Sequence, residues 1–517
     1  MRPSAEDPAD PGQLPEASRF MRPTLKSDPP QPSSPSSVLA ARVGPASQRI
    51  LSGPLALEVA RFGVPLAVGM GLQTSFNLVD AYIISGLGGS KASAALGAIG
   101  VADLIGAVGT ILSYGLSIAT SAMISRKQGE GDMDGVRRIA WQSVLLLVGV
   151  SAIVSSIGIF GAEALMVGLA GAKGEVARVG TQFLRVMMGG SFTIFLLLHL
   201  ISIQRALGSS KTPIVLLVIA NLANLALAVL FVYGPGPAPA IFSWGPPLAA
   251  ALHLPRMELV GAAWATVIAR CFGLIPIFYI SFHRFGLFGA EDRLLPNWVQ
   301  MRRIWNIGWP TSSQLVVRVF AIFVVVAVAQ RLYTTAEDQS MSTALGLVLR
   351  LETMALYVGL GWGSAAQTFV GQNLGAVQNS RAKQSGWYAT LYNAIMMAAF
   401  ASACWVWGRQ FVMLFDATPS VVEDSMQYLG IVAPGYVGLG IGIVLGSAIQ
   451  GAGATRQSLR LDALVIAFVQ IPLCAAAYVM RWDAPSLWAA VFATYIAFAL
   501  IYIASYRQGA FLRHDLE

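Results

Sequence analysis

One carboxylate and two amide side chains share a face of an apolar segment near the start of the chain. Gln73, Asn77 and Asp80 are spaced i, i+4 and i+7, which places them on the same side of an α-helix. Because the other positions are mostly apolar, we predict that Asp80 lies within a membrane. An ionisable group is costly there and is therefore a candidate for binding a proton or cation. The alternative is that Asp80 lies close enough to the helix end to reach the membrane interface.

The composition of the chain indicates a polytopic helical membrane protein. Of its 517 residues, 55% are hydrophobic and 12% are charged, whereas a soluble domain has about 25% charged residues. The net charge of +8 is better explained by cytoplasmic loops than by nucleic-acid binding. We expect the lipid bilayer as a partner and no nucleic acid. The three cysteines lie in apolar runs without ligand spacing, so we expect neither disulfides nor a metal site.

Apolar segments of about 20 residues or more follow one another from Pro54 onward. We therefore predict an all-α membrane protein with twelve transmembrane helices. The approximate ranges are 57–84, 92–125, 138–163, 175–206, 212–233, 258–283, 304–331, 339–372, 384–411, 420–450, 458–480 and 485–507. Four prolines within these ranges are candidate kinks, namely Pro65, Pro310, Pro434 and Pro472.

The distribution of basic residues predicts the topology. Sixteen lie in loops and helix ends on one side and seven on the other, so the first side is predicted to be cytoplasmic, with both termini there. We expect a multi-pass protein of the cytoplasmic (inner) membrane. The predicted divisions are a disordered Pro-rich tail at 1–50, an N-terminal six-helix lobe at 51–284, a cytoplasmic linker at 285–303, a C-terminal six-helix lobe at 304–508 and a tail at 509–517.

An internal repeat relates the two halves. Three short matches occur at offsets of 245 or 246 residues, namely 63–65 with 308–310, 115–129 with 361–375 and 208–211 with 453–456. Each repeat holds six helices, an even number, so both repeats have the same orientation in the membrane. We predict two six-helix bundles related by an axis along the membrane normal, an arrangement typical of alternating-access transporters.

The chain resembles the multidrug and toxic compound extrusion (MATE) family over residues 54–507. The resemblance rests on Gln73 with the string at 77–88 (Asn-Leu-Val-Asp-Ala-Tyr-Ile-Ile-Ser-Gly-Leu-Gly), and on the strings at 95–100, 208–213, 261–269, 350–352 and 370–376 (Val-Gly-Gln-Asn-Leu-Gly-Ala). It implies two six-helix lobes in a V. It also implies export of amphipathic, often cationic compounds, driven by inward flow of H⁺ or Na⁺.

The resemblance also implies a cation site in the first lobe. There the family places an Asp on the first helix, an Asn and an Asp on the fifth and a Thr on the sixth. The first Asp matches Asp80, the Asn matches Asn224 and the Thr matches Thr266, whereas Ala228 replaces the second Asp. Where some members carry a Glu in the second lobe this chain has Arg318, and 434–450 holds no acidic residue. We therefore expect no cation site in the second lobe.

The reduced first-lobe site favours H⁺ over Na⁺ as the coupling ion. Dehydrated Na⁺ needs several oxygen ligands, whereas a proton needs one carboxylate held out of water. We expect Asp80 to be deprotonated when a cationic substrate binds from inside. Protonation from outside then changes its hydrogen bonds with Gln73, Asn77 and Asn224 and releases the substrate.

Four further ionisable residues are predicted to lie within the membrane. Asp103 and Arg185 are expected at similar depth and could form an ion pair that stabilises the lobe or, less favoured, serves as a proton relay. Alternatively, Asp103 compensates for the Asp missing at Ala228. Arg318 and Glu352 are expected to pair in the second lobe. If Arg318 instead faced the cavity unpaired, it would favour neutral or anionic substrates.

We therefore predict a secondary active antiporter. It would export an amphipathic, cationic small molecule in exchange for H⁺ (or, less favoured, Na⁺), act as a monomer and need no further cofactor. No catalytic set, nucleotide loop or metal-ligand spacing indicates an enzyme. A lipid-linked precursor flippase of related architecture is the first alternative, with Arg185, Arg270 and Arg318 as basic cavity residues. A channel or a non-transporting receptor is the alternative from another class.

Overall fold

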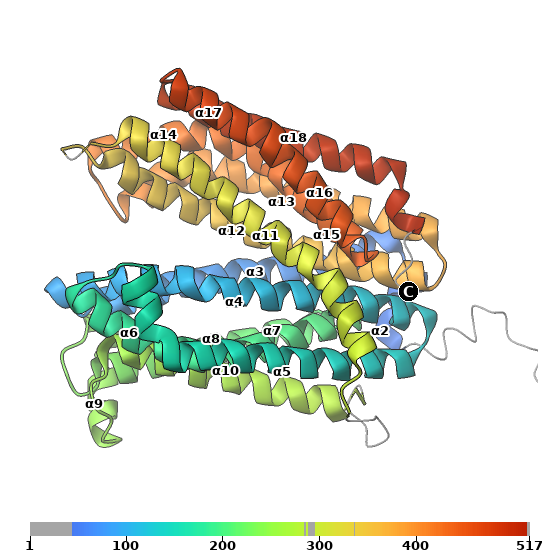
Figure 1. Ribbon diagram of the computed structural model, residues 1–517, viewed down its shortest axis with the longest axis horizontal. Coiled ribbons are helices and arrows are strands. Elements are labelled where there is room, and N and C mark those ends of the chain that lie inside the picture. The colour runs from blue at the N-terminus through green and yellow to red at the C-terminus, as the bar shows by residue number, and fades with distance from the viewer. Residues whose placement is uncertain (1–43, 284–285, 288–294, 336, 514–517) are drawn as a thin grey trace, which may run out of the picture.

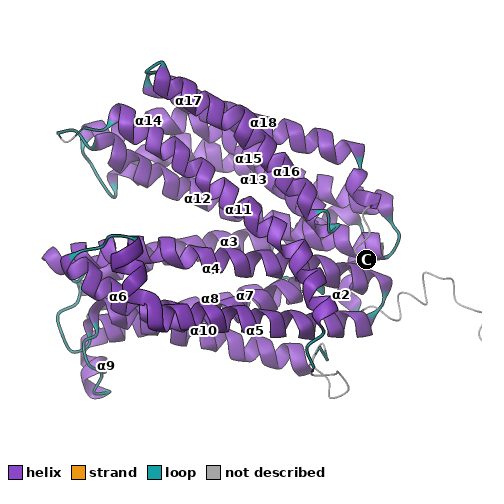
Figure 2. Cartoon of the chain, in the orientation of Figure 1, coloured by secondary structure: helices purple, strands orange, loops and turns teal. Residues whose placement is uncertain are grey.

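The chain forms two helical lobes that lie side by side (Figure 1). The computed structural model describes residues 44–283, 286–287, 295–335 and 337–513, with only the backbone at 73–78 and 90. All regular structure in these ranges is helical (Figure 2). Eleven helices there are long and apolar enough to cross a membrane, and one bent pair makes a twelfth span. The predicted all-α fold of twelve spans in two six-helix bundles is confirmed.

The first lobe contains the first six spans. They are α3 (Leu55–Ser85), α4 (Gly89–Glu130), α5 (Met133–Glu163) with the π-helix η1 (Ala164–Leu169), α6 (Gly174–Gly189) with α7 (Ser191–Ala206), α8 (Lys211–Tyr233) and α10 (Glu258–His283). Short helices α2 (Pro45–Ser52), η2 (Ala240–Phe242) and α9 (Gly245–Ala251) lie outside the spans. The predicted helix at 175–206 is broken, because α6 and α7 meet at an angle of 44°.

The second lobe contains the other six spans. They are α11 (Trp298–Tyr333), α12 (Ser340–Gly375), α13 (Asn379–Met413), α14 (Pro419–Val432) with η3 (Ala433–Gly435) and α15 (Tyr436–Gly451), α16 (Thr455–Val465) with the π-helix η4 (Ile466–Gln470) and α17 (Ile471–Val479), and α18 (Ala484–Gln508), which precedes η5 (Ala510–Arg513). Pro434 lies in a 3₁₀ turn and Pro472 follows a π-helical turn, whereas Pro65 and Pro310 lie within continuous helices.

Two predicted boundaries differ from the structure. The predicted tail at 1–50 overlaps α2, in which Ser47 and Ile50 are buried against the spans; the rest of the tail, 1–43, lies outside the described residues. The predicted linker at 285–303 overlaps the first turns of α11, which begins at Trp298 because Asn297 caps it by accepting hydrogen bonds from two backbone N–H groups.

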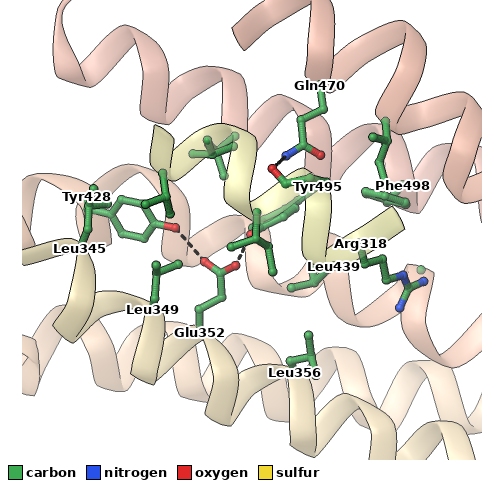
Figure 3. A pocket seen from close by; sticks show the side chains of 17 residues that line it. Arg318, Leu345, Leu349, Glu352, Leu356, Tyr428, Leu439, Gln470, Tyr495 and Phe498 are labelled. Atoms are coloured by element: carbon green, nitrogen blue, oxygen red, sulfur yellow. Dashed lines mark hydrogen bonds between the residues drawn. The ribbon is translucent and has the colours of Figure 1, made fainter. Parts of the chain in front are cut away.

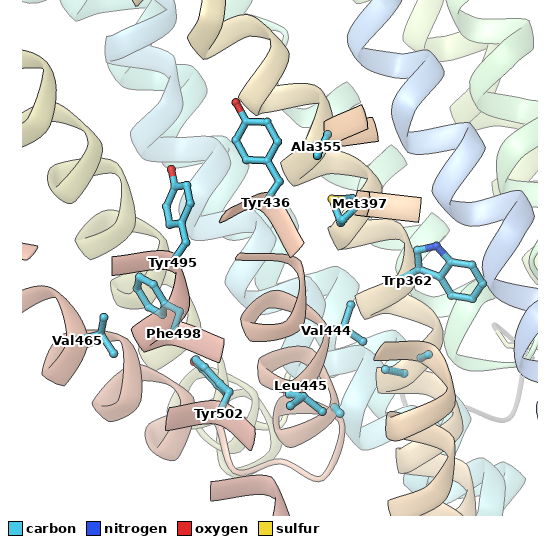
Figure 4. Close-up of a cluster of buried hydrophobic side chains, with 14 of the residues drawn as sticks. Ala355, Trp362, Met397, Tyr436, Val444, Leu445, Val465, Tyr495, Phe498 and Tyr502 are labelled. Carbon is cyan, nitrogen blue, oxygen red and sulfur yellow. The ribbon is translucent and has the colours of Figure 1, made fainter. Parts of the chain in front are cut away.

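The core of the second lobe extends onto the first half of α3. Its largest buried side chains include Trp362, Tyr436 and Tyr502 (Figure 4). Phe62 and Leu66 of α3 belong to the same apolar cluster. The start of the first span is therefore packed against the second lobe, which joins the two bundles.

The repeated glycines allow the two lobes to touch backbone to backbone. A Cβ atom at Gly129 of α4 would lie 2.0 Å from the carbonyl oxygen of Gln372 on α12. A Cβ atom at Gly375, the repeat counterpart of Gly129, would lie 2.0 Å from the carbonyl oxygen of Arg126 on α4. Only glycine permits such close approach at both positions. The repeat in the sequence is therefore also a repeat in the contact between the lobes.

The lobes meet at one end and diverge towards the other (Figure 1). The meeting end carries α2 and the C-terminal end of the described chain, whereas α9 lies at the opposite end. At the meeting end, side chains of α12 donate to backbone carbonyls of the first lobe: Gln372 Nε2 lies 2.7 Å from the oxygen of Ala206, and Gln367 Nε2 lies 2.9 Å from that of Ile118. These contacts hold that end closed.

Candidate functional site

Asp80 and Asn224 form the polar centre of the first lobe. Asp80 lies one and a half turns before the end of α3 and is half-buried, and Asn224 is buried on the facing helix α8. The Asn224 Nδ2 atom lies 2.8 Å from Oδ1 and 3.0 Å from Oδ2 of Asp80. Within the described residues, the buried Oδ1 of Asn224 has no hydrogen-bond partner. The pair thus presents a carboxylate and a free amide oxygen, which are ligands for a proton or cation.

Arg270 on α10 adds a positive charge to this region. Its charge acts on the carboxylates of both Asp80 and Asp103, yet among the described residues it forms no ion pair with either. Two ionised carboxylates and one guanidinium leave one negative charge. A single proton or monovalent cation therefore neutralises the group.

Among the described side chains, Asn224 is the predicted member of the first-lobe site that forms hydrogen bonds with Asp80. The hydroxyl of Thr266 donates to the carbonyl of Ala262 in its own helix, at 2.8 Å. The side chains of Gln73 and Asn77 lie outside the described residues. Ala228, where the family has a second Asp, is buried in an apolar cluster with Ile83 and Ile84. The described part of the site therefore contains one carboxylate and one amide, and the roles of Gln73 and Asn77 stay predictions.

The predicted pair of Asp103 and Arg185 is wrong. Both side chains are exposed, and in the part of the chain that the structure describes no ion pair joins them. Asp103 instead shares a helical face with Tyr114 and Ile118, which lie 11 and 15 residues further along α4. These two residues line a cavity of about 20 Å³ together with residues of the second lobe. The exposed side chain of Asp103 lies about three helical turns from this cavity along α4.

A second buried carboxylate lies in the second lobe. Glu352 on α12 is 5% exposed and accepts hydrogen bonds from the hydroxyls of Tyr428, at 2.7 Å, and Tyr495 (Figure 3). No basic side chain pairs with Glu352 among the described residues. Two hydroxyl donors stabilise an ionised carboxylate but add no positive charge. This site can accept a proton without breaking an ion pair.

The predicted pair of Arg318 and Glu352 is also wrong. Arg318 on α11 forms an ion pair with Asp462 on α16, with Nη2 3.2 Å from Oδ1 and a second contact through Nε. Asp462 is fully buried and also accepts hydrogen bonds from Gln314 Nε2, at 2.8 Å, and from the Tyr502 hydroxyl, at 2.6 Å. Because its charge is matched and its oxygens are satisfied, this network is structural.

A small cavity separates Glu352 from Arg318. It has a volume of about 60 Å³, and its polar lining comes from Arg318, Glu352, Tyr428, Gln470 and Tyr495, whereas the remaining walls are apolar (Figure 3). Binding sites for drug-sized molecules have volumes of about 300–1,000 Å³. The cavity can hold a few water molecules or a small cation beside the carboxylate.

Sequence reasoning missed Asp462 and the two tyrosines. Asp462 lies between Arg460 and an apolar run, so it looks like a residue at the membrane interface. The available signal was Arg318 itself, because a buried guanidinium requires an acidic partner. Tyr428 and Tyr495 gave no signal, because tyrosine is common in apolar helices.

Comparison with known proteins identifies relatives along most of the chain. The sequence profile of the MatE family matches residues 65–230 and 312–476, one segment in each lobe. The chain is 27% identical over 426 residues to the "Probable multidrug resistance protein YpnP" of Bacillus subtilis, covering 82% of this chain and 88% of that protein. It is 24% identical over 434 residues to the "FAD transporter" of Shewanella oneidensis, covering 82% and 89%.

Solved structures share the fold. A MOP superfamily transporter from Pyrococcus furiosus superposes with a TM-score of 0.79 at 20% identity, covering 92% of this chain and 100% of that one. An outward-facing multidrug resistance MATE family transporter of the same superfamily gives the same TM-score, 0.79, with the same identity and coverage. Both therefore share the fold over most of this chain.

Proposed function

The chain belongs to the MatE family, so it is a multi-pass membrane transporter and not an enzyme. We propose that it is a secondary active antiporter. It exports amphipathic, cationic drugs or metabolites in exchange for H⁺. The names of its relatives, a probable multidrug resistance protein and an FAD transporter, support export of small organic molecules. The observation that carries the proposal is the hydrogen-bonded pair of Asp80 and Asn224 between α3 and α8.

Protonation of Asp80 changes what this pair can bind. The ionised carboxylate accepts the Asn224 amide on both oxygens, at 2.8 and 3.0 Å. A protonated carboxyl has one O–H donor, for which the free Oδ1 of Asn224 is a nearby acceptor. The exchange of donor and acceptor requires the amide or the helix to rotate. Gain of a proton thus alters the packing of α3 against α8 and couples the ion to the lobe.

The ligand set supports H⁺ over Na⁺. Dehydrated Na⁺ requires several oxygen ligands, and the described side chains supply the Asp80 carboxylate and one amide oxygen of Asn224. Ala228 removes the additional carboxylate that the family resemblance would place here. A proton needs only the carboxylate, and the amide oxygen then stabilises the protonated form.

The lobe arrangement supports alternating access, with this structure in the outward-open state. The lobes meet at the end that holds most basic loops, which by the positive-inside rule faces the cytoplasm, and diverge at the end that holds α9 (Figure 1). We place both termini in the cytoplasm and the protein, as a monomer, in the cytoplasmic (inner) membrane. Release of the substrate to the outside then follows from this state.

Glu352 is a second proton-binding candidate. It is buried without a basic partner among the described residues, beside a cavity of about 60 Å³. The sequence predicts no cation site in the second lobe because the family positions there lack a carboxylate. Glu352 supplies a carboxylate at a different position of the second lobe, on α12.

The charges between the lobes bear on the substrate class. Asp103 is exposed on α4, about three turns from the residues of that helix that line a cavity with the second lobe, and its carboxylate can attract a cationic group. A second candidate class is anionic, because Arg205 on α7 reaches only Ser364 Oγ, at 3.5 Å, and Met70 Sδ, at 3.7 Å, with no carboxylate partner in the described chain. The flippase alternative is weakened, because Arg318 is neutralised by Asp462 and Arg270 lies near two carboxylates.

Reconstitution into liposomes tests the proposal. A fluorescent cationic dye and a fluorescent anionic dye are each loaded, and efflux is measured under an imposed pH gradient or an imposed Na⁺ gradient. We expect pH-driven, saturable export of the cationic dye. Export driven only by Na⁺, or export of the anionic dye alone, would contradict the ion or the substrate class, respectively. Current through single channels without saturation would contradict a transporter mechanism.

A further inference from the structure

A large cavity lies at the end where the two lobes meet, away from both carboxylate sites. Its volume is about 850 Å³, which is within the range of small-molecule binding sites. Its walls come from α2, the start of α3, the turn before α8 and Phe369 of α12. The helix α2 closes one side and is bonded to both lobes: Ser47 Oγ accepts from Gln128 Nε2 at 3.1 Å, and the carbonyl of Ile50 accepts from Arg381 Nη2 at 3.0 Å.

Among the residues that the structure describes, the cavity carries two positive charges without acidic partners. Three basic side chains line it, Arg49, Arg61 and Lys211, together with the acidic Glu58. Arg61 is paired with Glu58 at 3.1 Å, whereas Arg49 and Lys211 form no ion pair within the described ranges. The net charge of the lining is therefore +2. Such a site attracts an anion.

The N-terminus of α8 points its dipole into the same region. Lys211 is the first residue of this 23-residue helix, and the preceding Ser210 does not cap it through its side chain. Gly208, with φ of +86°, makes the turn that precedes it, and a Cβ atom there would lie 3.2 Å from Ile50 of α2. Uncapped N–H groups and the positive end of the dipole favour a phosphate oxygen.

A buried hydrogen-bond acceptor in the cavity indicates that the ligand carries a donor group as well as an anionic group. Gln128, 4% exposed, lines the cavity, and its Oε1 has no hydrogen-bond partner among the described residues. A buried amide oxygen without a donor costs free energy, and it requires a donor such as a hydroxyl group. A phosphate ester that also carries a hydroxyl satisfies both requirements.

We propose that this cavity binds a hydroxyl-bearing phosphate ester, with the phosphate held by Arg49, Lys211 and the N-terminus of α8, and the hydroxyl donating to Gln128. The same chemistry is available from an anionic lipid headgroup, phosphatidylglycerol, and from a soluble ester, glycerol 3-phosphate. The site is separate from the transport proposal, because it involves neither Asp80 nor Glu352.

Binding to the full-length protein in neutral detergent tests the site without any transport measurement. A short-chain fluorescent phosphatidylglycerol is titrated, and glycerol 3-phosphate is added as a competitor. A Lys or Arg near a phosphate contributes about fivefold in affinity, so Arg49→Gln with Lys211→Gln should weaken binding about 25-fold. Displacement by glycerol 3-phosphate would identify the soluble ester as sufficient, and binding without displacement would identify the lipid.

Two further variants make the test specific. Arg456 is the repeat counterpart of Lys211 and does not line this cavity, so Arg456→Gln should leave the affinity unchanged. Gln128→Met should weaken binding of phosphatidylglycerol but not of short-chain phosphatidic acid, which lacks the headgroup hydroxyl. Equal loss in Arg456→Gln and in the double variant, or no loss in the double variant, would overturn the proposal.

Discussion

The side chain of Asn224 donates from one nitrogen to both carboxylate oxygens of Asp80, at 2.8 and 3.0 Å, and so joins α8 to α3 within the first lobe. The amide oxygen of the same residue remains without a partner in the described structure. Both oxygens of an ionised Asp80 carboxylate therefore accept a hydrogen bond, whereas the amide oxygen of Asn224 accepts none from the described residues. This asymmetry is the basis of the first prediction.

Asp80→Asn should abolish gradient-driven export while preserving the fold. The variant side chain has a similar shape and still offers an oxygen to Asn224, so the free energy of unfolding should change by no more than ~1 kcal/mol. In the wild type, binding of a cationic dye should strengthen with rising pH as Asp80 deprotonates. Because Asn does not ionise, dye binding to the Asp80→Asn variant should be independent of pH.

Dye efflux from proteoliposomes and dye binding at pH 5–8 check this prediction. The matched control is Asp134→Asn, because the Asp134 side chain is 83% exposed in the first turn of α5. If Asp80→Asn exported the dye at the wild-type rate under a pH gradient, Asp80 would not be the coupling residue.

Glu352→Gln should reduce the number of protons exchanged per substrate. Both hydroxyls, of Tyr428 and Tyr495, donate to the Glu352 carboxylate. A Gln oxygen accepts from one hydroxyl, whereas its NH₂ group donates to the other and leaves that hydroxyl's proton without an acceptor, so the variant should also lose about 1–3 kcal/mol of stability. The proton-to-dye ratio is measured with a pH indicator inside liposomes.

Combining Glu352→Gln with Tyr495→Phe separates coupling from stability. The second change removes a hydroxyl whose proton has lost its acceptor, so the thermal midpoint should recover, while the proton ratio should stay reduced. Recovery of both quantities in the double variant would show that Glu352 acts only in packing.

Much of the fold could be predicted because it depends on local, periodic features. The apolar runs gave the spans, and the repeated glycines gave the twofold relation, since Gly129 and Gly375 occupy equivalent contacts between the lobes. The break of 44° at Gly190 was missed, although Gly189, Gly190 and Ser191 are residue types at which helices kink.

The partners of the buried charges could not be predicted in the same way. Asp80 and Asn224 were correctly brought together, through the family resemblance. Arg318 was assigned to Glu352 because both lie near mid-membrane, but the choice between Glu352 and Asp462 depends on side-chain direction in three packed helices. That direction is set by tertiary packing and leaves no periodic signal in the sequence.

Asp462→Asn should destabilise the second lobe strongly. It leaves the guanidinium of Arg318 buried without its carboxylate partner, at a cost of about 3–5 kcal/mol. Replacing both residues, Arg318→Met with Asp462→Leu, removes the uncompensated charge and should restore most of the stability. Thermal unfolding in detergent measures both. A double variant as unstable as Asp462→Asn would show that the hydrogen bonds of Asp462 to Gln314 and Tyr502 matter more than the ion pair.

Gly375→Ala should shift the protein away from the conformation described here. The added methyl group would lie 2.0 Å from the carbonyl oxygen of Arg126, so α4 and α12 must separate at the end where the lobes meet. Because the lobes move as packed bodies, opening one end should bring the other ends together. Spin labels at Lys173 and Ala417, in loops of the two lobes at the diverging end, should then report a shorter distance.

Gly346→Ala on the same helix is the matched control, because nothing lies within 4 Å of a Cβ atom there. This variant has the same general gain in helix propensity from Gly to Ala, about 1 kcal/mol, but no steric clash with the first lobe. The spin-label distance should therefore be unchanged in Gly346→Ala and shorter in Gly375→Ala. An unchanged distance in both variants, with wild-type stability, would mean that the backbone contact between α4 and α12 does not set the conformation of the lobes.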